Sequence, residues 1–167
     1  TEGTVLSFGG AFSNHLAAVA YAGKMHHLST VGVVRGEEWA HKVEKRSTLH
    51  FCRSQGMDLH FVSRAEYREK EKGILVRSLR QKIKNVTILP EGGTNALAVR
   101  GCEEILTEAD QHFDTICCCV GTGGTLAGLI RSANQKQYVL GFNTLNKPSV
   151  KESISAFTPK QNWELLS

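Results

Sequence analysis

The sequence predicts an α/β protein in which parallel strands form sheets with helices on both faces. Short apolar segments typical of buried strands alternate with segments whose apolar residues recur at helical spacing. Three glycine turns, at Gly9-Gly10, at Gly92-Gly93 and at residues 121–124, each follow a strand-like segment and precede a helix-like one. Ligands of parallel sheets lie beyond the carboxyl ends of the strands, so we expect the three turns to converge on one ligand.

The expected strands share short apolar or β-branched runs that end at glycine, proline or charged residues. They are residues 4–8, 29–34, 59–62, 86–89, 114–120 and 138–142. The expected helices share apolar residues three and four positions apart. They are residues 14–22 with Gly23 near the end, 39–55 stopped by Gly56, part of 64–84, 96–106 and 126–130. From residue 143 onward no pattern predicts an element.

Length and composition indicate a globular protein, because 167 residues with 41% hydrophobic residues can bury a core. The length fits one domain or two small lobes, and we expect lobes at residues 1–85 and 86–167. A net charge of +4 is mild, and the basic residues of segment 64–84 are interspersed with glutamates, which is typical of a solvated helix face. We therefore expect neither a nucleic acid partner nor, since the apolar runs are short, a membrane partner.

Five cysteines include the triplet 117–119 in an apolar strand, which we interpret as small buried hydrophobic residues. The odd count, without C-x-x-C pairs or a signal peptide, predicts a reducing cytoplasm. The histidines show no metal-ligand spacing, so no metal site is expected.

The turn at residues 121–124 has the chemistry of an anion site. Its glycines permit positive φ and close approach to the main chain, so successive N–H groups can converge at a helix start, where the dipole favours a phosphate. The run lacks the Gly-Lys-Ser/Thr ending of an NTPase phosphate loop and the G-x-G-x-x-G spacing of a dinucleotide site. A nucleotide is therefore the less favoured ligand. A turn that only connects strand and helix remains the alternative.

These motifs resemble those of a known family. The run 121–128, Gly-Thr-Gly-Gly-Thr-Leu-Ala-Gly, is similar to the phosphate loop of fold-type II pyridoxal-phosphate enzymes, the tryptophan synthase β and cysteine synthase group, and residues 9–15 resemble their asparagine loop. Together with segments 35–37 and 90–95, residues 8–15 look like the 1-aminocyclopropane-1-carboxylate deaminase and D-cysteine desulfhydrase family. The resemblance covers residues 4–142.

The resemblance implies a role for each lobe and for named residues. Residues 1–85 would be the smaller lobe with the asparagine loop, and 86–167 part of the larger, cofactor-binding lobe. Pyridoxal 5′-phosphate would be held by its phosphate at Gly121, Thr122, Gly123, Gly124 and Thr125, and by its ring hydroxyl at Asn14. Ser13 would be the catalytic proton-transfer or nucleophilic group. Ser13, Asn14 and His15 would bind the substrate carboxylate.

Purely structural roles remain open for several of these residues. Ser13 is also a good helix N-cap, and Asn14 in a first helical turn needs no ligand to explain it. His15 fits a packing or capping role, and Thr94 and Asn95 fit turn and cap positions at the border of a pocket.

The sequence departs from the family at the lysine that forms the Schiff base with the cofactor. In the family this lysine lies upstream of the asparagine loop, yet none of the thirteen residues before Asn14 is a lysine, and Lys24 lies after the loop. We therefore expect an internal fragment with an incomplete fold, which is inactive alone and prone to associate through uncovered surfaces, as a homo-oligomer.

Two functions follow as hypotheses. The first is a fragment of a pyridoxal-phosphate-dependent lyase or hydrolase of the deaminase or desulfhydrase type, which converts a small amino acid to a 2-oxo acid and ammonia. The second is a catalytically silent α/β module that binds a phosphate-bearing ligand or a partner protein.

Overall fold

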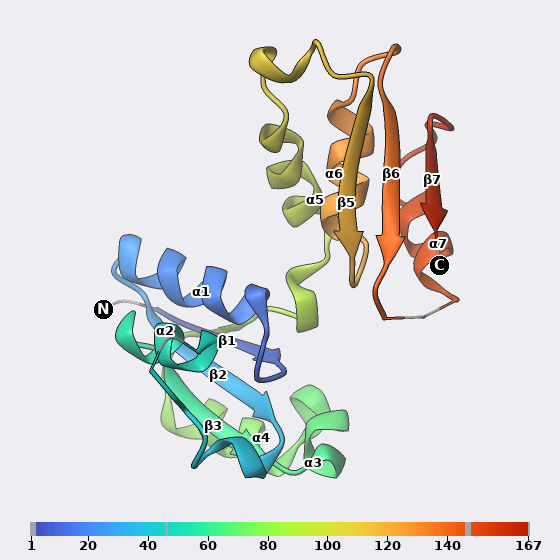
Figure 1. The fold of residues 1–167 in the computed structure, drawn as a ribbon. Helices are drawn as coiled ribbons and strands as arrows, with labels where there is room; N and C mark the ends of the chain where they lie inside the picture. The colour runs from blue at the N-terminus through green and yellow to red at the C-terminus, as the bar shows by residue number, and fades with distance from the viewer. Residues whose placement is uncertain (1–2, 46, 146–147, 167) are drawn as a thin grey trace. The chain divides into compact units, whose positions relative to one another are not determined.

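The computed structural model describes residues 3–45, 47–145 and 148–166. The chain forms two compact units, the first ending at Glu91 and the second beginning at Gly92. Each unit has its own parallel β-sheet with helices packed on it (Figure 1). The boundary was expected after residue 85, but it lies after Glu91 because strand β4 (Val86–Ile88) pairs with β1 (Thr4–Gly9) of the first sheet.

The first unit contains a four-stranded sheet in the order β3-β2-β1-β4, with every pair parallel. The other strands are β2 (Ser29–Arg35) and β3 (Asp58–Val62). The helices are α1 (Asn14–Met25), α2 (Thr48–Ser54), α3 (Arg64–Arg68) and α4 (Ile74–Lys82). Helical 3₁₀ turns lie at Glu37–Trp39 and Lys70–Lys72.

Helices cover both faces of the first sheet. One face packs against α1 and α2 through Leu16, Leu49 and Cys52. The opposite face carries Leu6 and Phe8 and packs against α3 and α4. Strands buried on both faces read as continuous apolar runs, which is why β1 and β2 were predicted nearly to their observed bounds.

The second unit contains a three-stranded parallel sheet in the order β5-β6-β7. Its strands are β5 (Thr115–Val120), β6 (Tyr138–Asn143) and β7 (Trp163–Leu166). Its helices are α5 (Ala96–Cys102), α6 (Gly124–Ser132) and α7 (Val150–Ser155), with 3₁₀ turns at Glu103–Ile105 and Glu108–Asp110. A further 3₁₀ turn, Glu91–Gly93, spans the boundary between the units. Buried residues of all three helices pack on one face of this sheet.

The interpretation of the cysteine triplet as buried was wrong. Cys117 and Cys119 are exposed and Cys118 is half-buried. In strand β5 alternate side chains point to opposite faces, and only the face with Cys118 packs against the core of the second unit. On the other face no helix of the described residues covers the sheet, and Tyr138 and Phe142 are about two-fifths exposed there.

The expected helix at 39–55 was also wrong in its first half. The structure has a 3₁₀ turn ending at Trp39 and no regular element over residues 40–45. Ser47, whose hydroxyl accepts a hydrogen bond from His50 N at 3.1 Å, is the N-cap of α2. Trp39 and Val43 gave the helical pattern because they pack on the α1–α2 core from irregular chain.

Gly23 lies near the end of α1, as expected, but within the helix, which ends at Met25. It is buried inside α1, where a Cβ would collide with Thr30, so it allows α1 to pack closely on β2. Helix α7 and strand β7 lie in the region where the sequence predicted no element.

Candidate active site

The turn after β5 has a geometry that can receive an anion. Gly123 has φ +91° and stands at the N-cap of α6, where no side chain caps the helix. The main-chain N–H groups of Thr122, Gly123, Gly124 and Thr125 donate to no acceptor among the described residues. The first turn of α6 contains no acidic side chain. A phosphate would satisfy these N–H groups and would meet the positive end of the helix dipole.

Gly123 is required here by space as well as by conformation. A Cβ at this position would lie 2.7 Å from Cγ1 of Ile154 in α7, and the left-handed φ is costly for any residue that carries a Cβ. The buried side of α6 thus holds the turn against the core.

The loop before α5 supports the anion-binding turn. The hydroxyls of Thr94 and Thr122 lie 2.6 Å apart, and a Cβ at Gly92, which has φ +73°, would lie 2.6 Å from Cγ2 of Thr122. Two of the three glycine turns therefore lie together, as expected. Asn95 is the N-cap of α5 and accepts from Ala98 N at 2.9 Å, which is the cap role weighed for it.

Thr94 is the residue that sequence reasoning underrated. It was interpreted as a turn residue, yet it hydrogen-bonds Thr122 and lies against Gly124. The available signal was its place directly after two glycines and before a helix cap.

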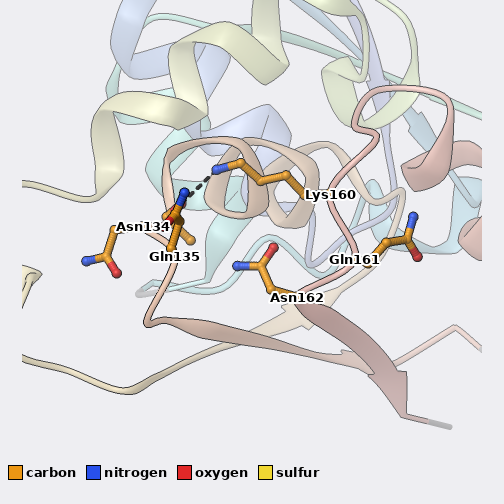
Figure 2. A pocket seen from close by; sticks show the side chains of 6 residues that line it. Asn134, Gln135, Lys160, Gln161 and Asn162 are labelled. Carbon is orange, nitrogen blue, oxygen red and sulfur yellow. Dashed lines mark hydrogen bonds between the residues drawn. The ribbon is translucent and has the colours of Figure 1, made fainter.

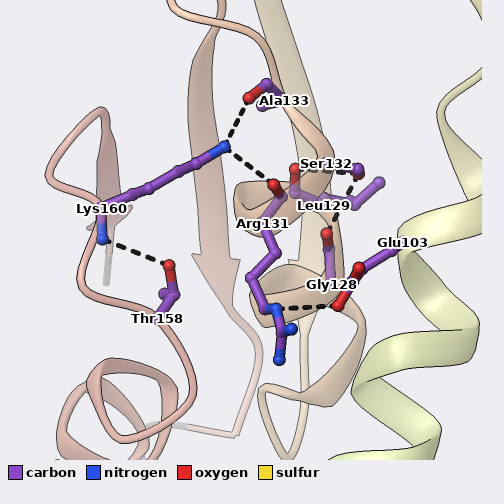
Figure 3. Close-up of polar contacts among 8 residues, drawn as sticks. All are labelled: Glu103, Gly128, Leu129, Arg131, Ser132, Ala133, Thr158 and Lys160. Carbon is purple, nitrogen blue, oxygen red and sulfur yellow. Dashed lines mark hydrogen bonds and ion pairs between the residues drawn. The ribbon is translucent and has the colours of Figure 1, made fainter.

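At the carboxyl end of α6, a lysine side chain of this chain neutralises the negative end of the helix dipole. The Nζ of Lys160 donates to the carbonyl of Arg131 at 2.8 Å and to that of Ala133 at 2.7 Å (Figure 3). Nearby, the side chain of Arg131 forms an ion pair with Glu103 at 2.8 Å. A cation at the last carbonyls complements the negative end of the helix dipole. The last carbonyls of α6 thus accept hydrogen bonds from Lys160, whereas the main-chain N–H groups at the start of α6 have no acceptor among the described residues.

A pocket of about 590 Å³ lies beside this carboxyl end (Figure 2). It is lined by Ala133, Asn134, Gln135, Lys160, Gln161 and Asn162. Because Lys160 is engaged by two carbonyls and the lining adds only neutral side chains, this pocket lacks the chemistry of the turn at Gly123.

In the first unit, the turn after β1 leads into α1 and has a different cap. The hydroxyl of Ser13 accepts a hydrogen bond from Leu16 N at 3.2 Å, so Ser13 is an N-cap, as expected. The main-chain N–H groups of Asn14 and His15 have no acceptor in the described part of the chain, and the first turn of α1 has no acidic residue. Ser13, Asn14 and His15 therefore form one cluster that can receive a small anion such as a carboxylate.

The imidazole of His15 forms a hydrogen bond with a buried residue of the first unit. Its Nε2 lies 2.7 Å from Oγ of Ser7, a fully buried residue of β1 whose hydroxyl donates to the carbonyl of Leu89 at 3.1 Å. Burial lowers the pKa of His15 below its ordinary value of 6.5, opposed in part by the negative charge of Glu91. No pattern in the sequence indicated that Ser7 would reach His15.

Charged residues gather near this cluster at the carboxyl ends of β2 and β4. Glu91 accepts from the hydroxyl of Tyr67 at 2.6 Å and from Nζ of Lys70 at 2.9 Å. The guanidinium of Arg35 lies 5.7 Å from the centre of the Tyr67 ring. Burial, then the hydrogen bond to Glu91, raises the pKa of Tyr67, so its hydroxyl stays protonated.

The structure therefore groups the predicted site residues into two clusters, one in each unit. Gly121 to Thr125 form the cluster of the second unit, and Ser13, Asn14 and His15 that of the first. Within residues 3–45, 47–145 and 148–166, no set of His, Cys, Asp and Glu side chains is arranged to hold a metal ion. Nor does any helix in the described part of the chain have the length and apolar character needed to cross a membrane.

A strand, a glycine turn with open amides and a helix without acidic residues are features of an α/β protein whose turn can receive an anion. Comparison with known proteins gives its family. Residues 2–161 match the family of pyridoxal-phosphate dependent enzymes, and the chain belongs to this family. The resemblance stated from the motifs is thereby confirmed, as are the α/β class and its parallel sheets. The open amides of residues 122–125 fit the cofactor's phosphate.

Among curated relatives, a Thermotoga maritima protein named "Putative 1-aminocyclopropane-1-carboxylate deaminase" is 35% identical in an alignment of 156 positions that covers 87% of this chain and 49% of that protein. An Arabidopsis thaliana protein named "Bifunctional D-cysteine desulfhydrase/1-aminocyclopropane-1-carboxylate deaminase, mitochondrial" is 28% identical, over 75% of this chain and 35% of that protein. The chain thus spans about half or less of the length of these relatives.

Solved structures show the same fold. A crystal structure of an ACC deaminase homologue aligns over 98% of this chain and 55% of its own, with a TM-score of 0.75 and 22% identity. A crystal structure of the T.th. threonine deaminase aligns over 85% of this chain and 44% of its own, with a TM-score of 0.63 and 19% identity. At these identities the likeness concerns the fold.

Proposed function

We propose that this chain carries the phosphate-binding and substrate-carboxylate-binding elements of a pyridoxal-phosphate-dependent lyase. Its substrate would be a small amino acid of the 1-aminocyclopropane-1-carboxylate or D-cysteine type, converted to a 2-oxo acid and ammonia, with sulfide released from D-cysteine. Of the reaction classes expected, deaminase and desulfhydrase agree with the relatives' names and make the enzyme a lyase; hydrolase fits less well. The open amides at the start of α6 are the observation that carries the proposal.

Each predicted residue has a task in this proposal. The amides of Gly121 to Thr125 and the Thr122 and Thr125 hydroxyls hold the phosphate. Asn14 donates to the ring hydroxyl of the cofactor, and the open amides of Asn14 and His15 receive the substrate carboxylate. When bound, pyridoxal phosphate supplies an electron sink for the amino acid.

Ser13 is proposed as the proton-transfer group. Its oxygen already accepts from Leu16 N, which leaves its O–H free to donate to a ligand. A serine hydroxyl is a weak acid and a weak base, so this role requires activation by the cofactor or a neighbour.

Turnover by these 167 residues alone is not expected. Lys24 lies in the last turn of α1, at the opposite end from Asn14, and its Nζ donates to Gln55 Oε1 at 3.2 Å. Lys70 is engaged by Glu91. Neither matches the lysine that the family uses upstream of the asparagine loop, because both come after Asn14 in the chain.

Titration with pyridoxal phosphate tests the proposal. We expect saturable binding, followed by absorbance, that inorganic phosphate displaces and that Gly123→Ala weakens. Gly101→Ala is the matched control, because Gly101 lies in α5 with ordinary φ and nothing within 4 Å of an added Cβ. Borohydride reduction that attaches the cofactor to a lysine of this chain would contradict the expected inactivity.

A catalytically silent module is the second candidate, favoured by the exposed face of the second sheet with Cys117, Cys119 and Phe142. It predicts no pyridoxal phosphate affinity together with a stable oligomer in sedimentation. A homo-oligomer and a cytoplasmic location remain predictions in both cases.

A further inference from the structure

We propose that Ser7 is a positioning residue that holds the His15 ring as the neutral tautomer with the proton on Nε2, so that Nδ1 is left as a hydrogen-bond acceptor. This inference rests on the proposed function for its meaning, since it assigns the substrate carboxylate to the main-chain amides of α1 and not to a positively charged imidazole.

The direction of the Ser7–His15 hydrogen bond follows from counting protons. Ser7 is fully buried, and its single hydroxyl hydrogen is donated to the carbonyl oxygen of Leu89 at 3.1 Å, an atom that can only accept. With that hydrogen on Leu89, we assign the contact of 2.7 Å between Ser7 Oγ and His15 Nε2 as a bond in which Nε2–H donates and Oγ accepts; the opposite direction would put the ring proton on Nδ1.

The remaining ring nitrogen is therefore unprotonated whenever His15 is neutral. Nδ1 has no partner in the described part of the chain. Partial burial disfavours the charged ring and lowers the pKa of His15. The opposing charge is Glu91, whose carboxylate is itself bound by the Tyr67 hydroxyl and the Lys70 ammonium. Those two contacts weaken the pull of Glu91 on a proton at His15.

The consequence concerns which ligand group can lie against the imidazole. An acceptor nitrogen repels a carboxylate and attracts a donor, such as the ammonium or thiol of a small amino acid. The open N–H groups of Asn14 and His15, in contrast, are donors at a positive helix end. These main-chain donors and the Nδ1 acceptor, which both belong to the first turn of α1, would bind different groups of an amino acid.

Nitrogen NMR of the ring in the full chain tests the assignment. At neutral pH we expect His15 to show a protonated Nε2 and an unprotonated Nδ1. A proton on Nδ1, or a charged ring, would overturn the inference. His60 is an internal reference, because its Nε2 lies 2.8 Å from the carboxylate of Asp58, far along the chain from Ser7.

The variant Ser7→Ala tests the positioning role itself. We expect the His15 signals to shift to a mixture of tautomers while those of His60 stay unchanged; unchanged His15 signals would overturn the role of Ser7. If this variant does not fold, Ser7→Thr, which retains the hydroxyl, is expected to keep the wild-type tautomer, and a mixture there would contradict the inference.

Titration with 1-aminocyclopropane-1-carboxylate, in the presence of pyridoxal phosphate, separates this inference from the proposed function. Binding that shifts the amide signals of Asn14 and His15 while the ring stays neutral supports both. Binding that charges the ring contradicts the inference alone. An absence of binding contradicts the proposed function, and the ring tautomer still decides the role of Ser7.

Discussion

The two helix starts, at α1 and at α6, have the same chain order of strand, glycine turn and helix but leave different groups open. At α1 the Ser13 hydroxyl satisfies one amide, and only Asn14 and His15 remain as open donors among the described residues there. At α6 the cap is Gly123, which has no side chain, and residues 122–125 all remain open. A large, doubly charged phosphate suits the second start, and a carboxylate suits the first.

The largest effect is expected from Gly123→Ala. The left-handed φ costs roughly 1–2 kcal/mol for a residue with a Cβ, and the clash with Ile154 adds an overpacking cost of roughly 1–3 kcal/mol. We expect a loss of about 3 kcal/mol in the free energy of unfolding, measured with urea, and at least about tenfold weaker binding of pyridoxal phosphate. An equal loss of affinity in Gly101→Ala would contradict a specific role of the turn.

Lys160→Met removes the cation from the far end of α6. Two hydrogen bonds from one partly exposed ammonium are lost, and we expect about 1–2 kcal/mol of destabilisation in thermal unfolding. Lys136→Met is the matched control, because Lys136 is exposed and its Nζ makes no contact among the described residues. If both substitutions have the same effect, Lys160 does not cap α6.

Thr94→Val tests whether the loop before α5 supports the open amides of α6. The substitution leaves the Thr122 hydroxyl without its partner, and we expect about 1 kcal/mol of weaker pyridoxal phosphate binding. Thr94→Ser keeps the hydroxyl and should retain the affinity. Equal affinity in the valine and serine variants would show that Thr94 does not orient the turn.

Ser13→Ala tests the cap of α1, the feature that distinguishes it from α6. We expect about 1 kcal/mol of destabilisation from loss of the N-cap. Ser13→Asn retains a capping oxygen without the hydroxyl and should restore stability. If Ser13→Asn also binds 1-aminocyclopropane-1-carboxylate as the wild type does, the Ser13 hydroxyl has no role in binding.

The difference between the two helix starts also shows what sequence reasoning can reach. Both turns, the cap at Ser13 and the open amides at the start of α6 depend on local chemistry, and all were predicted. The contacts Thr94–Thr122 and Ser7–His15 were not, because each joins residues brought together by tertiary packing. Strand β7 was missed for the same reason: its sequence has only a weak strand pattern, and its pairing with β6 depends on tertiary packing.

The prediction that the cysteine triplet is buried was wrong because burial also depends on distant parts of the chain. An apolar run predicts burial on both faces, but which faces are covered depends on helices elsewhere in the sequence. At β5 the covered face holds Cys118 and the other holds Cys117 and Cys119. At β1 the same kind of run is buried on both faces, because α1 and α4 lie on opposite sides.

The smallest effect is expected from the pH dependence of His15. Its pKa in the folded chain is below the ordinary 6.5, so the unfolded chain binds a proton more readily. The contribution of neutral His15 to the free energy of unfolding is therefore fully present above about pH 6.5. It is lost as the pH falls through the lowered pKa of the folded state. Urea unfolding of His15→Gln should depend less on pH in this window than the wild type does. A steeper dependence in the variant would mean that His15 is charged in the folded chain, and that the acceptor at the start of α1 does not exist.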